Sequence, residues 1–356
     1  MQSKARIHDA NLYPDPDPDP DQFDQIPDSL LLIILNNLSD IRSLGRCSVV
    51  SKRFNSLVPL VEDVYIKIDK VVTIDAENPY SISHKPRSYF YNLLKLFFTI
   101  LKPFHNIHNT NNSNKTLLPQ VSQHTSHTPD QVLKNFHQVR NLWIELPSGD
   151  VGTEDGVLLK WKAEFGSTLQ KCVILGGTQI DKKLVSDQGS GSTEDNGSIP
   201  ESFYTNGGLK LRVVWTISSL IAASTRHYLL QSIIKEHPTL QTVVLTDADG
   251  QGTLSMGDEQ LKDFREKPLA ASASSRRTQV PASNMKLRYA PYLELPEGMG
   301  MRGATLVAIK PSGEAGLGET KKEVESFVSG AFDEPFKAVV KTLVKRRTYL
   351  LEMNGF

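Results

Sequence analysis

The chain has 356 residues, and its 40 Lys and Arg residues balance its 40 Asp and Glu residues. This length predicts about two domains, and the neutral net charge argues against nucleic acid or an anionic membrane surface as a partner. Only two cysteines are present, Cys47 and Cys172, and neither stands beside a further metal-ligating residue. We therefore expect no metal, no disulfide framework and a reducing compartment. The N-terminus has no apolar stretch of signal-peptide length, so secretion is not expected.

The first part of the chain contains several segments that are unlike a packed domain. Residues 1–22 are predicted to be a disordered acidic tail, because Pro14–Asp21 alternates proline with aspartate. Residues 59–103 are predicted to connect two structured blocks and to contain an apolar helix at Ser88–Lys102. That helix is too short to cross a membrane, so it should pack on its neighbours, with an interfacial membrane helix as the alternative. Residues 104–130 are predicted to be a polar low-complexity linker, and the irregular spacing of its histidines argues against a metal site.

Residues 131–356 alternate strand-like and helix-like patterns. Four runs rich in β-branched and aromatic residues predict strands: Val139–Leu146, Leu169–Leu175, Leu209–Ile217 and Leu240–Thr246. Other segments have helical periodicity: Gly156–Phe165, Ser218–His237, Glu319–Val328 and Glu334–Lys345. The last apolar run, Thr348–Met353, is expected to add a strand or an extended tail.

These patterns predict an α/β fold, with α+β possible. Leu169 and Leu240 open similar runs, and one strand plus one helix per unit is typical of leucine-rich repeats. We therefore expect a degenerate leucine-rich-repeat-like domain, with an ordinary α/β domain with right-handed crossovers as the alternative. Asp247–Gly250 resembles the opening of a calcium-binding loop but lacks the later ligands, so it is interpreted as a polar turn.

Residues 23–58 show the pattern of three short helices. Pro27 suits the first turn of a helix, and the run Leu30–Leu35 is apolar throughout. A helix that is apolar around so much of its circumference must be covered on more than one side. Ser39–Asp40 can cap a second helix, and Val50, Phe54 and Leu57 have the spacing of one face of a third.

A module of this size, below about 40 residues and without a disulfide or metal, usually needs a partner to bury its apolar surface. Its residues resemble the F-box: Ile26-Pro27, then Leu30, Leu31, Ile34, Leu35 and Leu38, then Asp40 and Leu44, then Val50 to Phe54 and Leu57. Ile26, Ser51 and Phe54 depart from the family's usual Leu, Cys and Trp.

The resemblance implies that the module binds the Skp linker protein and, through it, a cullin–RING ubiquitin ligase. The residues expected to contact the linker are Pro27, Leu30, Leu31, Ile34, Leu35, Val50 and Phe54, with Ile33 and Leu38 expected to face the protein's own core. Residues 131–356 are expected to bind a target protein. No catalytic residue, cofactor or metal is expected, because the chain has no recognisable nucleophile or phosphate-binding motif.

A longer resemblance, carried by SVVSKRFNSLVPLVEDVYIKID, RHYLLQSIIKEHPTL and EPFKAVVKTLVKRRTYLLEMNGF, is to the plant auxin-up-regulated F-box family. It implies a substrate adaptor in protein ubiquitination during auxin response, located in the nucleus or cytoplasm. Two alternatives remain: a scaffold protein that does not assemble a ligase, and an F-box hormone receptor with a small-molecule pocket.

Overall fold

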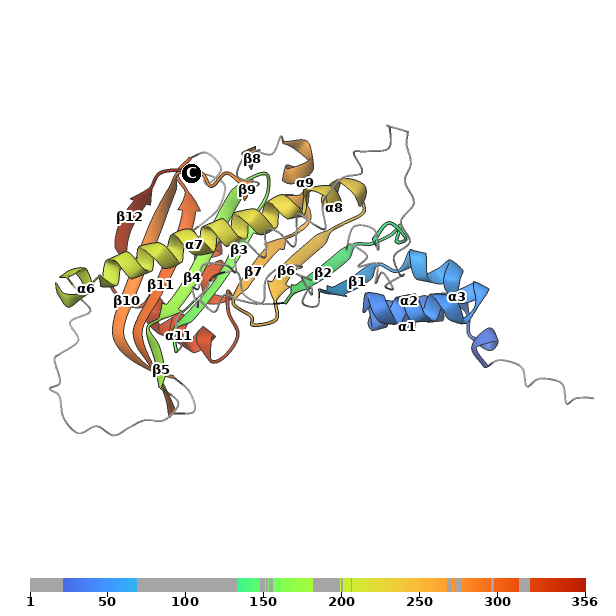
Figure 1. Ribbon diagram of the computed structural model, residues 1–356, viewed down its shortest axis with the longest axis horizontal. Helices are drawn as coiled ribbons and strands as arrows, with labels where there is room; N and C mark the ends of the chain where they lie inside the picture. The colour runs from blue at the N-terminus through green and yellow to red at the C-terminus, as the bar shows by residue number, and fades with distance from the viewer. Residues whose placement is uncertain are drawn as a thin grey trace, which may run out of the picture.

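The computed structural model describes most of the predicted structured blocks (Figure 1). The described residues are 22–68, 133–147, 151, 153, 156–181, 199, 201–205, 207–267, 271–272, 277–295, 298–313 and 321–356. The predicted tail apart from Gln22, the predicted helix at Ser88–Lys102 and the predicted linker at 104–130 lie outside this part of the chain.

The N-terminal module folds as the sequence predicts, into three short helices in close succession. They are α1 (Asp28–Leu38), α2 (Ile41–Val50) and α3 (Lys52–Leu57), preceded by η1 (Gln22–Gln25) and followed by η2 (Val58–Leu60). Asp40 caps α2, because its carboxylate accepts hydrogen bonds from the Ser43 amide at 3.0 Å and the Ser43 hydroxyl at 2.7 Å. Ser51 caps α3 in the same way, through the amide of Phe54 at 3.2 Å.

The rest of the described chain is built on one large mixed sheet. Within the described residues, ten strands join in the order β1-β2-β6-β7-β3-β4-β11-β10-β12, with β5 paired to β11. The strands β1, β2 and β6 are parallel neighbours, as are β3 and β7, and the other pairs are antiparallel. The bounds are β1 Asp63–Lys67, β2 Asn141–Leu146, β3 Leu158–Phe165, β4 Leu169–Gly177, β5 Gln179–Asp181, β6 Thr242–Asp247, β7 Gly252–Met256, β10 Ser283–Leu295, β11 Met299–Pro311 and β12 Tyr349–Met353. A separate pair consists of β8 (Ala271–Ser272) and β9 (Arg277–Thr278).

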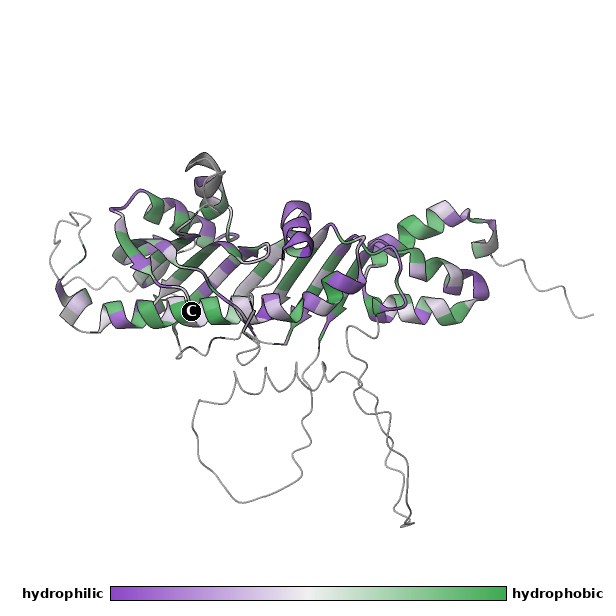
Figure 2. Cartoon of the chain, turned by 90° about the horizontal axis from the view of Figure 1, so that it is seen from above, coloured by the Kyte–Doolittle hydropathy of each residue, from purple (hydrophilic) through white to green (hydrophobic). Residues whose placement is uncertain are grey.

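Helices cover both faces of this sheet (Figures 1 and 2). One face carries the long α7, whose buried residues cluster with Ile174 of β4 and with the core of the N-terminal module. The opposite face carries α11, which packs over Val173 and Leu175, the alternate residues of the same strand. The helices of this part are α6 (Glu201–Thr205), α7 (Gly208–Leu229), α8 (Gln231–Glu236), α9 (Asp258–Glu266), α10 (Lys321–Ser329) and α11 (Phe336–Val344). None of the helices in the described ranges is long and apolar enough to cross a bilayer.

Two predicted elements have the opposite type in the structure. The predicted helix at Gly156–Phe165 is strand β3, in which every second residue from Leu159 to Phe165 is buried. The predicted strand at Leu209–Ile217 belongs to α7, where Arg212 and Trp215 turn inward while Val213 and Val214 stay exposed. Tertiary packing therefore overrides the β propensity of the two valines.

The sheet order contradicts the leucine-rich-repeat hypothesis. Repeat units stack in chain order, each with a strand parallel to the next, whereas β4 lies antiparallel between β3 and β11. The similar runs opened by Leu169 and Leu240 are β4 and β6, which are separated by two other strands. The α/β class itself is confirmed, and the long hairpin of β10 and β11 is an element that the sequence analysis did not predict.

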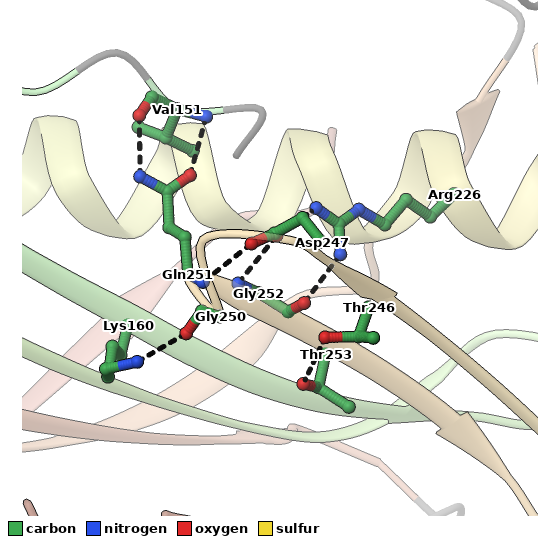
Figure 3. A network of polar contacts seen from close by, with 9 residues as sticks. All are labelled: Val151, Lys160, Arg226, Thr246, Asp247, Gly250, Gln251, Gly252 and Thr253. Carbon is green, nitrogen blue, oxygen red and sulfur yellow. Dashed lines mark hydrogen bonds and ion pairs between the residues drawn. The ribbon is translucent and has the colours of Figure 1, made fainter. Parts of the chain in front are cut away.

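A buried ion pair fastens α7 to the turn between β6 and β7 (Figure 3). Arg226 of α7 lies 2.6 Å from the carboxylate of Asp247, and both side chains are fully buried. Asp247 also accepts hydrogen bonds from the amides of Gln251 at 2.7 Å and Gly252 at 2.9 Å. A Cβ atom at Gly252 would collide with the ring of Trp161, over which the Arg226 guanidinium lies at 4.6 Å. The predicted polar turn thus holds α7 in place against the sheet through Asp247 and Arg226.

Candidate functional site

The outer surface of the N-terminal module is unusually apolar. Leu30 and Ile34 on α1 are 51% and 52% exposed, and Val50 at the end of α2 is 73% exposed. Figure 2 shows the density of apolar residues in these helices. We call the following residues the exposed apolar set: Phe23, Pro27, Leu30, Ile33, Ile34, Leu38, Val49 and Val50. An exposed group of this kind is typical of a protein-binding surface.

The inner surface of the same module is already occupied by the protein's own core. Leu31 and Leu35 of α1 are 1% and 2% exposed, and they pack in one cluster with Leu44, Leu57 and the first strands of the sheet. At about 3.6 residues per turn, the pair of positions 31 and 35 lies about 100° around the helix from the pair of positions 30 and 34. In this structure Leu31 and Leu35 are therefore inaccessible to a partner.

Two residues of α1 that were expected to face the core are exposed to solvent in the structure. Ile33 and Leu38 were expected to face the core, but both are exposed beside Leu30 and Ile34. This expectation is wrong, because positions 30, 33 and 34 lie on one side of the helix. Leu38 follows the buried Leu31 by two turns, but it is exposed at the end of the helix. Val49 and Phe23 are further exposed residues that the sequence analysis missed, although their apolar character was a visible signal.

Phe54 is half-buried and holds the start of the module. Its ring packs edge-to-face on Phe23, with 5.9 Å between the ring centroids. The neighbouring Arg53 lies 2.6 Å from the carboxylate of Asp28 and donates to the carbonyl oxygens of Phe23 at 2.7 Å and of Ile26. These contacts fix η1 and the first turn of α1 against α3, which sets the position of Pro27.

The module is joined to the sheet by hydrogen bonds as well as by its core. The side-chain oxygen of Asn36 accepts from the amide of Glu62 at 2.8 Å, and the carbonyl of Ser39 accepts from the amide of Tyr65 at 2.9 Å. Since Tyr65 belongs to β1, the end of α1 is attached directly to the first strand of the sheet.

A polar group on the first two strands supports this junction. The hydroxyl of Tyr65 donates to Glu145 of β2 at 2.6 Å, and Lys67 lies 2.8 Å from the same carboxylate. The hydrogen bond to Glu145, together with burial, raises the pKa of Tyr65 to about 12. Lys67 and then Tyr65 lower the pKa of Glu145, so the carboxylate is ionised at neutral pH and binds both partners.

The described residues contain no group of three or more His, Cys, Asp or Glu side chains placed to hold a metal ion. The exposed apolar set consists only of hydrocarbon and aromatic side chains and can neither ligate a metal nor transfer a proton. Its chemistry is that of association with another apolar surface.

Comparison with known proteins agrees with the geometry of the module. The family model described as F-box-like matches residues 23–67, which include α1, α2, α3 and β1. Two proteins of Arabidopsis thaliana are similar over almost their whole length. F-box protein At4g18380 is 53% identical, with 98% of this chain and 97% of the relative covered. F-box protein AUF1 is 36% identical, with 94% and 100% covered. No solved structure matches the chain.

Proposed function

Since the chain belongs to the family of F-box proteins, which generally act as substrate adaptors of Skp–cullin–F-box (SCF) ubiquitin ligases, we propose that it recruits a target protein to such a ligase. The module at residues 23–58 binds the Skp linker subunit, and the sheet domain binds the target. The chain itself carries out no chemistry. It accelerates ubiquitin transfer by raising the concentration of the target near the charged conjugating enzyme.

The observation that carries this proposal is the division of α1 into two apolar sides. On one side, Leu31 and Leu35 are buried in the protein's own core and attach α1 to the fold. The apolar residues on the other side are not part of this core. The other side keeps Leu30, Ile33 and Ile34 about half exposed. Burying the remainder of such side chains contributes on the order of 1 kcal/mol each, which supports a partner of helix-in-groove type.

We further propose that the adaptor works in the auxin response of a plant and is located in the nucleus or cytoplasm. Similarity to F-box proteins AUF1 and AUF2, at 36% and 38% identity, supports the first part of this extension. Both cysteines, Cys47 and Cys172, are free thiols, which is compatible with a reducing compartment.

The test is capture of the purified chain by the Skp linker protein, comparing wild type with a Leu30→Asp, Ile34→Asp double variant. Both side chains are exposed, so the substitutions should leave the fold intact while placing two charges in the interface. We expect the affinity to fall by at least about 100-fold, since apolar anchors at an interface commonly contribute about 2 kcal/mol each. Leu35 is unsuitable for this test because its substitution by Asp would charge the core.

The matched control is Val214→Asp, which places the same charge at a half-exposed apolar position of α7 in the sheet domain. It should bind the linker as wild type does. Failure of the folded wild-type chain to bind the linker would contradict the proposed function, as would equal loss of binding in the control.

A further inference from the structure

The far end of the sheet from the N-terminal module contains a pocket of about 480 Å³. It lies on the face that carries α10 and α11, where Phe327 and Val344 form part of its wall. In the sheet register, Leu350 of β12 lies beside Lys286 of β10, which lies beside Ala308 of β11. The floor of the pocket is thus an apolar row interrupted by one cation.

The charge of the pocket is mainly positive. Its lining residues include four cations, Lys171, Lys286, Arg288 and Lys310, and two carboxylates, Glu325 and Glu352. Lys171 is bound by Glu164 at 3.0 Å. Arg288 differs, because its Nε atom is buried and has no hydrogen-bond partner among the described residues.

A buried guanidinium nitrogen without a partner is costly, because burial removes its water. The same burial lowers the pKa of Arg288 from its usual value, with Glu325 opposing the shift. A carboxylate is the group that best satisfies a guanidinium, since it accepts two parallel hydrogen bonds from it. An acidic ligand group is therefore the complement of this end of the pocket.

The pocket also reaches an open sheet edge. It is lined by three consecutive residues of β12, Leu350, Leu351 and Glu352, whose side chains alternate between the two faces. It therefore borders the backbone of this strand. Among the described strands β12 pairs only with β10, so it ends the sheet, and Leu350 is 75% exposed at this border. An unpaired strand edge is a template for an incoming strand.

We propose that this pocket is the target-binding site, and that its occupant is an extended segment of the target protein that combines acidic and apolar side chains. The segment pairs with the outer edge of β12 as an added strand. Its apolar side chains cover Leu350 at the edge, and its carboxylates bind Lys286 and Arg288 on the next strand inward. This assignment rests on the proposed function, of which it names the second binding partner.

The position of the pocket suits an adaptor. β1 beside the N-terminal module and β12 beside the pocket are opposite ends of the sheet order (Figure 1). A target at β12 therefore leaves the exposed apolar set free for the Skp linker protein. The two partners are expected to bind at the same time and without competition.

The experiment is selection of a random 12-residue peptide library against the full chain at a physiological ionic strength of about 0.15 M, which screens weak surface attraction. We expect enriched peptides to contain at least two Asp or Glu residues interspersed with Leu, Ile, Val or aromatic residues. A synthetic peptide of this kind should bind the Lys286→Gln, Arg288→Gln double variant at least ten-fold more weakly than wild type. The same peptide with alternate backbone amides N-methylated should also bind at least ten-fold more weakly, because strand pairing is blocked.

The control variant is Lys262→Gln, which removes an exposed cation of α9 outside the pocket. It should bind the peptide as wild type does. Capture by the Skp linker protein, measured on each variant, shows that it is folded and reports on the proposed function separately. A charge-reversed Lys286→Glu, Arg288→Glu variant should recover binding to a peptide whose acidic residues are replaced by Lys.

Three outcomes would overturn the inference. Enriched peptides could lack acidic residues, the Gln double variant could bind the peptide unchanged, or no peptide could bind more tightly than about 1 mM. The last result would leave the pocket to a small anionic ligand in place of a peptide. Loss of linker capture with retained peptide binding would instead contradict the proposed function alone.

Discussion

His227 of α7 is a titratable side chain that the fold holds in its neutral form. Its Nε2 atom donates to the carbonyl of Gly166 at 2.8 Å, so its Nδ1 atom accepts from the hydroxyl of Thr278 at 2.7 Å. The ring stacks on Phe165 at 4.5 Å and meets Phe264 edge-on at 5.1 Å. Burial lowers its pKa to about 3, although the bond to Gly166 opposes the shift.

We expect this histidine to make the protein less stable as pH falls below about 6.5, its ordinary pKa. Above that pH the His227 side chain is neutral in both the folded and the unfolded protein. Below it the unfolded state gains a proton that the folded state does not bind, so the free energy of unfolding falls by up to about 1.4 kcal/mol per pH unit. Denaturant unfolding of wild type and His227→Gln at pH 7.5 and 5.5 measures the effect.

The stability difference between the two proteins should narrow at the lower pH, because the glutamine variant lacks the proton uptake. His137→Gln, at an exposed position before β2, is the control and should differ from wild type equally at both pH values. A constant difference for His227→Gln would contradict the prediction.

The sequence predicted which single residues are important better than it predicted where their side chains point and what they contact. Asp247 was predicted to lie in a polar turn, and it does, but its partner Arg226 is 21 positions earlier and could be found only from the fold. Leu31 and Leu35 were grouped with Leu30 and Ile34 because the resemblance to the F-box implies that all four contact the linker. Which of the two pairs is buried depends on the side of the helix that the sheet covers, and the tertiary fold decides this.

At the scale of elements, the contacts of Arg53 connect α3 with the start of α1. We predict that Arg53→Ala loosens residues 23–30, since the variant loses the ion pair to Asp28 and leaves the carbonyls of Phe23 and Ile26 without this donor. The local cost should be about 1–3 kcal/mol. Hydrogen exchange of the amides in this segment should rise accordingly, and linker binding should weaken because Pro27 loses its fixed position.

The neighbouring Lys52→Ala is the control for this prediction, because Lys52 is exposed on the same helix. Its exchange pattern should match that of wild type. Unchanged exchange at residues 23–30 in Arg53→Ala would show that the core residues of the module, without the arginine, hold the segment in place.

Helices and strands were predicted correctly where nearby residues in the sequence determine them, and wrongly where tertiary contacts do. Two of the three helices of the module, α2 and α3, have capping residues, Asp40 and Ser51, that can be read from the sequence. The strand β3 alternates buried and half-buried residues, a pattern of period two that the helical interpretation overlooked. The β-branched run in α7 was interpreted as a strand, because the contacts that make it a helix are tertiary, such as Trp215 packed on Gly176, where a Cβ atom would collide with the ring.

At the scale of the whole molecule, the module and the sheet share one core. Leu35 and Leu44 cluster with Val64 of β1, Leu142 of β2 and the buried face of α7. We therefore predict that Leu35→Ala lowers the free energy of unfolding by about 2–5 kcal/mol. The tryptophan fluorescence transition should shift with it, although Trp143, Trp161 and Trp215 all lie outside the module.

The control is Ile33→Ala, which shortens an exposed residue of the same helix and should cost less than about 1 kcal/mol. Two separate transitions, with the fluorescence transition unchanged in Leu35→Ala, would show that the module unfolds independently. The predicted boundary at residue 58 would then separate two parts of the chain that unfold independently.

The unbroken hydrogen bonding from β1 to β12 has a mechanical consequence. At roughly 4.8 Å per strand, the eight steps between these strands span about 40 Å, and within the described residues every step is a ladder of paired backbone groups. Because each of these strands is hydrogen-bonded to its neighbours, we expect the distance between the two ends of the described sheet to change little. If the chain binds its partners as proposed, a segment held at β12 would therefore keep a nearly constant distance from the linker-binding module. The choice of the lysine that accepts ubiquitin would then depend on the shape and flexibility of the target protein.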